Sequence, residues 1–199
     1  MEENNRSLIV VDLDNTILSR LFSLDSFSVN ALIQAQNSGH IVMITTASPS
    51  CMELPYHRTM GLHGPIATLN GAYCYHSDDP ELPTRESLIG EGDIAAILEA
   101  ITNAEIRCTW LENGDDLYAS FPLSFPHPLF QEVFRQSSVK FSEVLPVLPT
   151  GRFCAYAETS LQMDAFLARA CFKTLKLTKV KCKREKQPHE SRRLSSHIA

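Results

Sequence analysis

Two aspartates one residue apart follow the first apolar segment of the chain. Asp12 and Asp14 come directly after the run Leu8 to Val11. The loop after a buried parallel strand lies at the carboxyl end of the sheet, where α/β proteins bind their ligands. Two carboxylates at this range repel each other unless a cation or a proton offsets their charge. The spacing favours a Mg²⁺ site at which one aspartate attacks a phosphoryl group and the other handles the leaving group's proton.

A structural interpretation of the same pair stays open. Asp12 could cap the loop after its strand, and Asp14 could be solvated. Whether the pair forms a Mg²⁺ site depends on the strands and helices that position it.

Three apolar segments, with helical patterns between them, predict the scaffold that positions the aspartates. The expected elements are a continuous apolar strand at residues 7–12, covered on both faces, a helix capped by Asp25 or Ser26 and stopped by Gly39, a strand in HIVMITTASPS (40–50), a short helix opened by Pro49, and a strand in GPIATLNGAYCY (64–75). This alternation implies a right-handed parallel α/β unit.

From about Pro80 the pattern changes to α+β. The expected elements are a helix with Ile94, Ile97, Leu98 and Ile101 on one face, a hairpin around Asn113-Gly114-Asp115, a helix at 128–136, extended segments at 144–148 and 152–157, and a helix capped by Ser160 that runs to Ala170. We therefore expect an α+β insert, distinct from the parallel core before it.

The ends of the three predicted parallel strands carry the segments DLDNT, TTAS and LNGA. In order and spacing they resemble the motifs of the Cof-like sugar phosphatases of the haloacid dehalogenase (HAD) superfamily, closely over residues 7–76. The resemblance implies a HAD-like α/β parallel-sheet core with an inserted α+β cap that closes over it. It also implies Mg²⁺-dependent hydrolysis of a small phosphate monoester, a phosphosugar, through an aspartyl-phosphate.

The same resemblance assigns the catalytic roles. It makes Asp12 the nucleophile and Asp14 the general acid/base, with both carboxylates as metal ligands. The hydroxyl of Thr46 would hydrogen-bond a phosphoryl oxygen. The alternative interpretation of Thr46 is a hydroxyl that merely ends a strand.

Three further residues are assigned to the substrate side. Thr16 would support the loop of the first motif, and Asn70, followed by Gly71, would place its amide near the substrate. An ordinary Asn-Gly turn is the alternative interpretation of the last two.

The chain departs from the family pattern at several positions. Asn15 replaces a glycine, a mild change because Asn tolerates left-handed backbone angles. Ala47 and Ser48 replace a Gly-Arg pair, which removes a cation near the phosphate. The family also has a downstream lysine and a Gly-Asp loop that completes the metal site, but here no Gly follows Gly151 and no Asp follows Asp164. We therefore expect a truncated chain with weak or no activity.

The charge distribution marks a boundary near Lys173. From this residue onward nine of the 18 Lys and Arg stand against two acidic residues, while residues 1–172 carry nine basic and 21 acidic residues. The predicted organisation is a core at 1–79, a cap at 80–171 and a basic, disordered tail at 172–199 that is unrelated or out of frame.

Composition limits the other function classes. The acidic, polar start is unlike a secretion signal and no apolar run could span a bilayer, so we expect a cytoplasmic protein without membrane partners. A nonenzymatic protein that binds a ligand or partner is the rival hypothesis. The tail has no aromatic residue after Phe172, so nucleic acid would bind only nonspecifically. A response-regulator receiver domain is a third hypothesis, but the Asp-x-Asp spacing and the predicted insert argue against it. Separately, we expect the chain to associate with other polypeptides through an exposed sheet edge.

Overall fold

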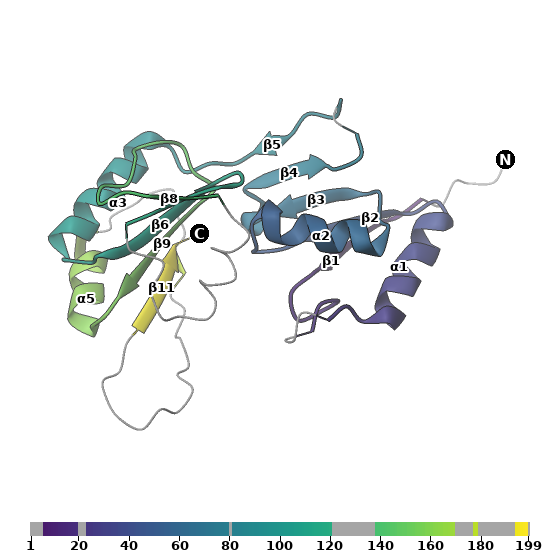
Figure 1. Ribbon diagram of the computed structural model, residues 1–199, viewed down its shortest axis with the longest axis horizontal. Coiled ribbons are helices and arrows are strands. Elements are labelled where there is room, and N and C mark those ends of the chain that lie inside the picture. Colours follow the sequence, from purple (N-terminus) through teal and green to yellow (C-terminus); the bar gives the residue numbers. More distant parts are fainter. Residues whose placement is uncertain are drawn as a thin grey trace, which may run out of the picture. The chain divides into compact units, whose positions relative to one another are not determined.

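The computed structural model describes residues 6–19, 23–79, 81–120 and 138–169, and the backbone of 177–178 and 194–198. They divide into two units, one up to Ser87 and one from Leu88 onward (Figure 1). The sequence placed this boundary at 79/80. Residues 85–86 belong with the first unit because they pair with its sheet.

The sheet of the first unit has the strand order β1-β2-β3-β4-β5. Its strands are β1 (Leu8–Asp12), β2 (Ile41–Thr45), β3 (Pro65–Thr68), β4 (Tyr73–His76) and β5 (Arg85–Glu86). The first three are parallel, as predicted, and β4 and β5 add antiparallel pairs. The carboxyl ends of β1, β2 and β3 therefore meet at one edge of an α/β sheet.

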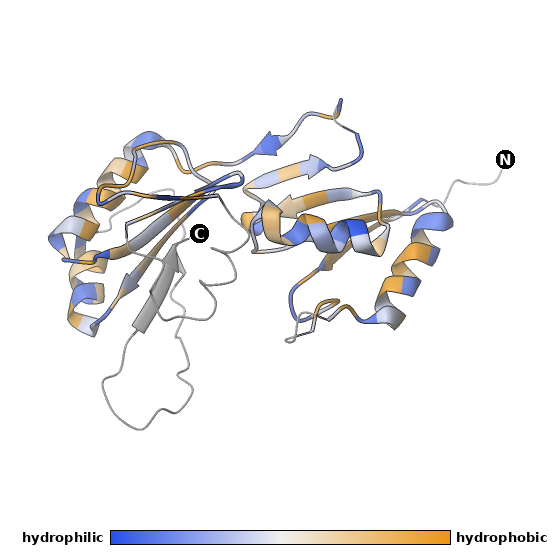
Figure 2. Ribbon diagram, viewed as in Figure 1, coloured by the Kyte–Doolittle hydropathy of each residue, from blue (hydrophilic) through white to orange (hydrophobic). Residues whose placement is uncertain are grey.

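Helices α1 (Ser26–Asn37) and α2 (Ser50–Met60) make the crossovers between these strands. Asp25 caps α1, since its carboxylate accepts a hydrogen bond from the Ser28 amide at 2.9 Å. Gly61 ends α2 in the left-handed conformation, with φ 67°. The apolar residues of α1 (Figure 2) pack against a core that includes Leu13, Ile17 and Ile44.

Helix α2 buries two titratable residues one turn apart, Glu53 and His57, which are 0% and 1% exposed. Neither Glu53 oxygen has a hydrogen-bond partner among the described residues. Burial raises the pKa of Glu53 to about 7 and lowers the pKa of His57. Both shifts favour the neutral form, which is how the helix can bury these side chains.

The sheet of the second unit has the order β10-β11-β9-β6-β7-β8. The elements are α3 (Glu91–Asn103), β6 (Cys108–Asn113), β7 (Asp116–Ala119), β8 (Ser138–Phe141), β9 (Arg152–Ala157), α5 (Ser160–Arg169), β10 (Leu177–Thr178) and β11 (Leu194–Ile198). Helices α3 and α5 pack with the sheet around Ile97, Leu111 and Phe153. The β6-β7 hairpin turns at Gly114, with φ 60°, as the Asn-Gly signal predicts.

Two short stretches of the region predicted to be a disordered tail are strands. β11 pairs antiparallel with β9, and β10 pairs with β11. The rest of 172–199 and the helix predicted at 128–136 lie outside the described residues. None of the helices in the described part of the chain has the length and apolar character that crossing a bilayer requires.

Strand β1 corrects one expectation. Its apolar run predicted burial on both faces, but Leu8 and Val10 are 57% and 53% exposed. The reason is its position at the edge of the described sheet, where it pairs only with β2 and where one face has no described element packed on it. An apolar edge strand with unpaired backbone groups is a template for association.

We predict that Val10→Lys reduces self-association of the chain, because a lysine on an edge strand opposes further pairing. Sedimentation velocity would show oligomers or aggregates of the unaltered chain and a shift toward the monomer in the variant. Val144→Lys is the matched control, since Val144 is 79% exposed in the second unit. An unaltered chain that sediments as a uniform monomer would contradict the prediction.

Candidate active site

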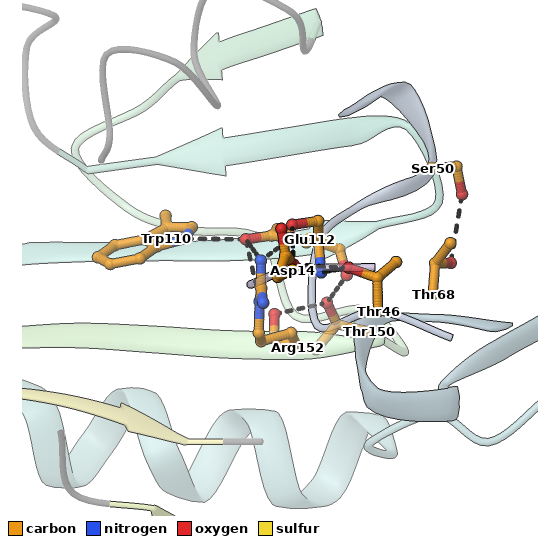
Figure 3. Close-up of polar contacts among 9 residues, drawn as sticks. Asp14, Thr46, Ser50, Thr68, Trp110, Glu112, Thr150 and Arg152 are labelled. Atoms are coloured by element: carbon orange, nitrogen blue, oxygen red, sulfur yellow. Dashed lines mark hydrogen bonds and ion pairs between the residues drawn. The ribbon is translucent and has the colours of Figure 1, made fainter. Parts of the chain in front are cut away.

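A hydrogen-bonded cluster joins the ends of β1 and β2. The Thr46 hydroxyl donates to Asp14 Oδ2 at 2.9 Å, and the Ser48 hydroxyl donates to the same oxygen at 3.2 Å. The Ser48 amide donates in turn to Thr46 Oγ1 at 2.9 Å. Thr46 is 3% exposed and Asp14 is half-buried, so the hydrogen bonds of the cluster are largely shielded from solvent (Figure 3).

Asp12, the last residue of β1, is exposed beside this cluster. Partial burial and the nearby charge of Asp14 raise the pKa of its carboxyl group, while a backbone hydrogen bond from Leu13 opposes the shift. Repulsion between two neighbouring carboxylates is the feature that the Asp-x-Asp spacing predicts. The pair thus has one restrained carboxylate and one that is open to solvent.

The loops that carry these side chains use left-handed backbone angles. Asn15 has φ 58°, a left-handed angle that asparagine tolerates. In the 3₁₀ turn η1 (Leu69–Gly71), Leu69, Asn70 and Gly71 all have positive φ, at 50°, 57° and 89°. Three successive residues in this region form a tight turn at the end of β3.

The turn at η1 lies against the end of β2. The backbone N–H of Asn70 donates to the Thr46 carbonyl at 3.1 Å, and the backbone N–H of Leu69 donates to the Ser48 carbonyl at 3.1 Å. Asn70 and Gly71 are exposed. The structure therefore brings Asp12, Asp14, Thr46 and the Asn70 turn to one edge of the sheet.

Thr16 lies in the loop after β1 and is exposed, with its amide bonded to the Leu13 carbonyl at 3.4 Å. Its expected role as a support of this loop stays a prediction. No hydrogen bond of its side chain is found with the described residues of the cluster.

Sequence reasoning missed Ser48 as a member of the cluster. It treated Ser48 only as the replacement of a cation, whereas its hydroxyl and amide bind Asp14 and Thr46. Ser50 and Thr68 also lie at this edge, with their hydroxyl oxygens 3.4 Å apart (Figure 3). The run of hydroxyl residues after β2 was the available signal.

The donor set suits a hard divalent cation. Asp12 and Asp14 supply carboxylate oxygens, and Mg²⁺ is commonly held by one or two carboxylates together with phosphate oxygens of the substrate and water. Among the described residues, no group of three or more His, Cys, Asp or Glu side chains could hold a metal. The two aspartates fit such an ion only when oxygens from substrate or solvent complete its shell.

A separate polar cluster lies within the second unit. Arg152 donates two hydrogen bonds of 2.7 Å from Nη2 to the two carboxylate oxygens of Glu112, and Trp110 donates to Glu112 Oε1 at 3.0 Å. The side chains of Glu112 and Arg152 are 2% and 15% exposed. Since the charges are paired and hydrogen-bonded, we interpret the cluster as a structural ion pair.

Residues 9–172 match the family of haloacid dehalogenase-like hydrolases. A curated relative, 5-amino-6-(5-phospho-D-ribitylamino)uracil phosphatase YitU of Bacillus subtilis, is 31% identical over 116 residues, which are 58% of this chain and 43% of that protein. The match thus spans less than half the length of that relative.

Solved structures show the same fold. A haloacid dehalogenase-like hydrolase from Bacteroides thetaiotaomicron aligns with TM-score 0.72 and 13% identity, over 98% of this chain and 71% of that one. The subclass IIB sugar phosphatase BT4131 aligns with TM-score 0.64 and 14% identity, over 98% and 70%. At these identities the likeness concerns the fold alone.

Proposed function

Because the chain belongs to the haloacid dehalogenase-like hydrolase family, we propose that its site hydrolyses small phosphate monoesters, phosphosugars among them, with Asp12 as nucleophile. The observation that carries the proposal is the contrast between the two aspartates. Asp14 is restrained by the Thr46 and Ser48 hydroxyls, while Asp12 is exposed at the end of β1. A fixed acid beside an accessible carboxylate is the arrangement that a two-step phosphoryl transfer needs.

In the first step, an Asp12 carboxylate oxygen bonds to phosphorus while the bond from phosphorus to the substrate's ester oxygen breaks. Asp14 in its protonated form gives its proton to the departing oxygen. In the second step, water attacks the aspartyl-phosphate and Asp14 takes the water's proton, so that phosphate leaves and Asp12 is regenerated. Asp14 therefore acts first as acid and then as base.

Thr46 and Asn70 support this reaction from neighbouring loops. The Thr46 hydroxyl lies within reach of Asp14 and could turn to donate to a phosphoryl oxygen, stabilising its charge. The backbone N–H of Asn70 fixes its turn to the end of β2 through the Thr46 carbonyl, and in our proposal the side-chain amide of Asn70 contacts the substrate from this turn. Mg²⁺ held by Asp12, and by Asp14 when that group is ionised, would supply positive charge that offsets the phosphoryl oxygens.

We predict slow, Mg²⁺-dependent hydrolysis of p-nitrophenyl phosphate by the chain. Among these 199 residues no Gly follows Gly151 and no Asp follows Asp164, so they do not include the further acidic loop that the resemblance to sugar phosphatases implies. Loss of one electrostatic element at such a site costs about a hundredfold or more in rate. Release of p-nitrophenol should fall to background in EDTA. A hydrolysis rate that EDTA does not change would contradict the predicted dependence on Mg²⁺. Rapid hydrolysis would contradict the prediction that the rate is low.

A further inference from the structure

A pocket lies in the first unit, at the opposite end of the sheet from the two aspartates. It has a volume of about 650 Å³ and is lined by residues at the beginnings of β2 and β3 and by β4. Its lining includes Ile41, the first residue of β2, whereas Thr46 follows the last residue of the same strand. Five residues of extended chain separate them, about 16 Å, so the pocket is distinct from the candidate active site.

The arginine and histidine side chains in the lining of this pocket make it basic in character. Two arginines, Arg6 and Arg85, and three histidines, His40, His63 and His76, contribute to it, and the described lining contains no Asp or Glu. Arg85 and Glu86 are adjacent in β5, so their side chains point to opposite faces, and only Arg85 reaches the pocket. The pocket lining is thus basic, whereas residues 1–172 as a whole carry more acidic than basic residues.

The two arginines are available to a ligand. Neither forms an ion pair with a described carboxylate, and both are exposed at the rim. A guanidinium group carries a fork of N–H donors that matches the oxygens of a phosphate. The arginines come from opposite edges of the sheet, before β1 and in β5, and both provide charge and directed donors to the one pocket that they line.

The histidines are held by their surroundings. The Ser7 amide donates to His40 Nδ1 at 3.2 Å, so the other ring nitrogen of His40 carries a proton that it can donate. His63 Nδ1 lies 2.6 Å from Asp78 Oδ2, which orients that ring. His76 Nδ1 is buried without a hydrogen-bond partner among the described residues. A polar atom in this position needs a partner from outside the described chain.

The rest of the lining is largely apolar. Ile41 and Pro65 come from the starts of β2 and β3, and Leu82, which is 50% exposed, lies on the segment before β5. Basic groups beside apolar surface suit a ligand with a charged head and an apolar body. A bare inorganic ion would use only part of this surface.

We propose that this pocket is a second ligand site, which binds a small organic phosphate through Arg6 and Arg85, with its apolar part against Ile41, Pro65 and Leu82. The site is separate from the one that carries the proposed hydrolysis. Its occupancy depends neither on Mg²⁺ nor on the two aspartates.

Equilibrium dialysis of the whole chain against phenylphosphonate in EDTA tests the proposal. This probe has an anionic head and an apolar ring, and it has no ester bond to hydrolyse. We expect saturable binding that Arg85→Gln weakens by at least about tenfold, the value of one hydrogen bond to a charged group. Arg58→Gln, which removes the same charge from an exposed residue of α2 outside the pocket, should change binding by less than about twofold.

A second variant and a second readout locate the site. Arg6→Gln should weaken binding as Arg85→Gln does, and the ring-proton resonances of His40 and His76 should shift on titration with the probe. Absence of saturable binding, equal losses in Arg85→Gln and Arg58→Gln, or binding that leaves both histidine resonances unmoved would each overturn the proposal.

Discussion

Asp12→Asn is expected to lower the Mg²⁺-dependent hydrolysis of p-nitrophenyl phosphate by at least about a hundredfold, to the background rate. The substitution keeps the size of the side chain and removes the carboxylate that attacks phosphorus, and loss of a nucleophile removes a transition-state interaction that no other group replaces. Asp12 is exposed at the end of β1, so the variant should fold like the unaltered chain. Thermal unfolding curves of the two proteins check this point.

Asp115→Asn is the matched control for that experiment. Asp115 is exposed at the turn of the β6-β7 hairpin, and the change in charge and shape is the same. Its hydrolysis rate should equal that of the unaltered chain. Hydrolysis that survives Asp12→Asn would show that another group attacks phosphorus or that the activity belongs to a contaminant.

Arg152→Met is expected to destabilise the second unit by about 3–5 kcal/mol. The substitution leaves the Glu112 carboxylate, which is 1% exposed, without its cationic partner in the interior. Breaking a buried pair by removing one member costs this much because the remaining charge is uncompensated. Trp110 is the only tryptophan of the chain and donates a hydrogen bond to Glu112, so its fluorescence during urea unfolding reports on this cluster.

Two further variants separate charge burial from simple loss of contacts. The double variant Glu112→Gln with Arg152→Met should regain part of the lost stability, since no buried charge is left. Lys140→Met breaks the exposed pair of Lys140 with Asp116 and should have a small effect. If Arg152→Met unfolds at the same urea concentration as Lys140→Met, the ion pair with Arg152 does not stabilise the buried Glu112 carboxylate.

The sequence was informative where local patterns decide structure. The apolar runs before Asp12 and Thr46 predicted parallel strands whose ends meet, because side chains at the carboxyl ends of neighbouring parallel strands share one edge. Asn15 has a left-handed angle, which agrees with the expectation that Asn tolerates such angles where the family has a glycine. The Asp-x-Asp pair was identified from its place after the first strand and Thr46 from the resemblance to the sugar phosphatases, and their catalytic roles stay predictions.

Features that depend on register or on distant neighbours were not predictable. Glu112 and Arg152 are 40 residues apart and face each other only because β6 and β9 pair in one register. The exposure of Val10 depends on which elements lie beside β1, and an apolar segment in the sequence does not predict its neighbours. The residues that line the basic pocket come from five separate segments of the chain, so no sequence motif predicts the pocket.

Reduction of an aspartyl-phosphate tests the central claim most directly. Sodium borohydride converts an aspartyl-phosphate to homoserine, and mass spectrometry of peptides locates the change. After incubation of the whole chain with p-nitrophenyl phosphate and Mg²⁺, our account predicts homoserine in place of Asp12, and none when EDTA replaces the metal. Homoserine at Asp14 or at another aspartate, or no conversion while p-nitrophenol is released, would contradict the assignment of Asp12 as the nucleophile.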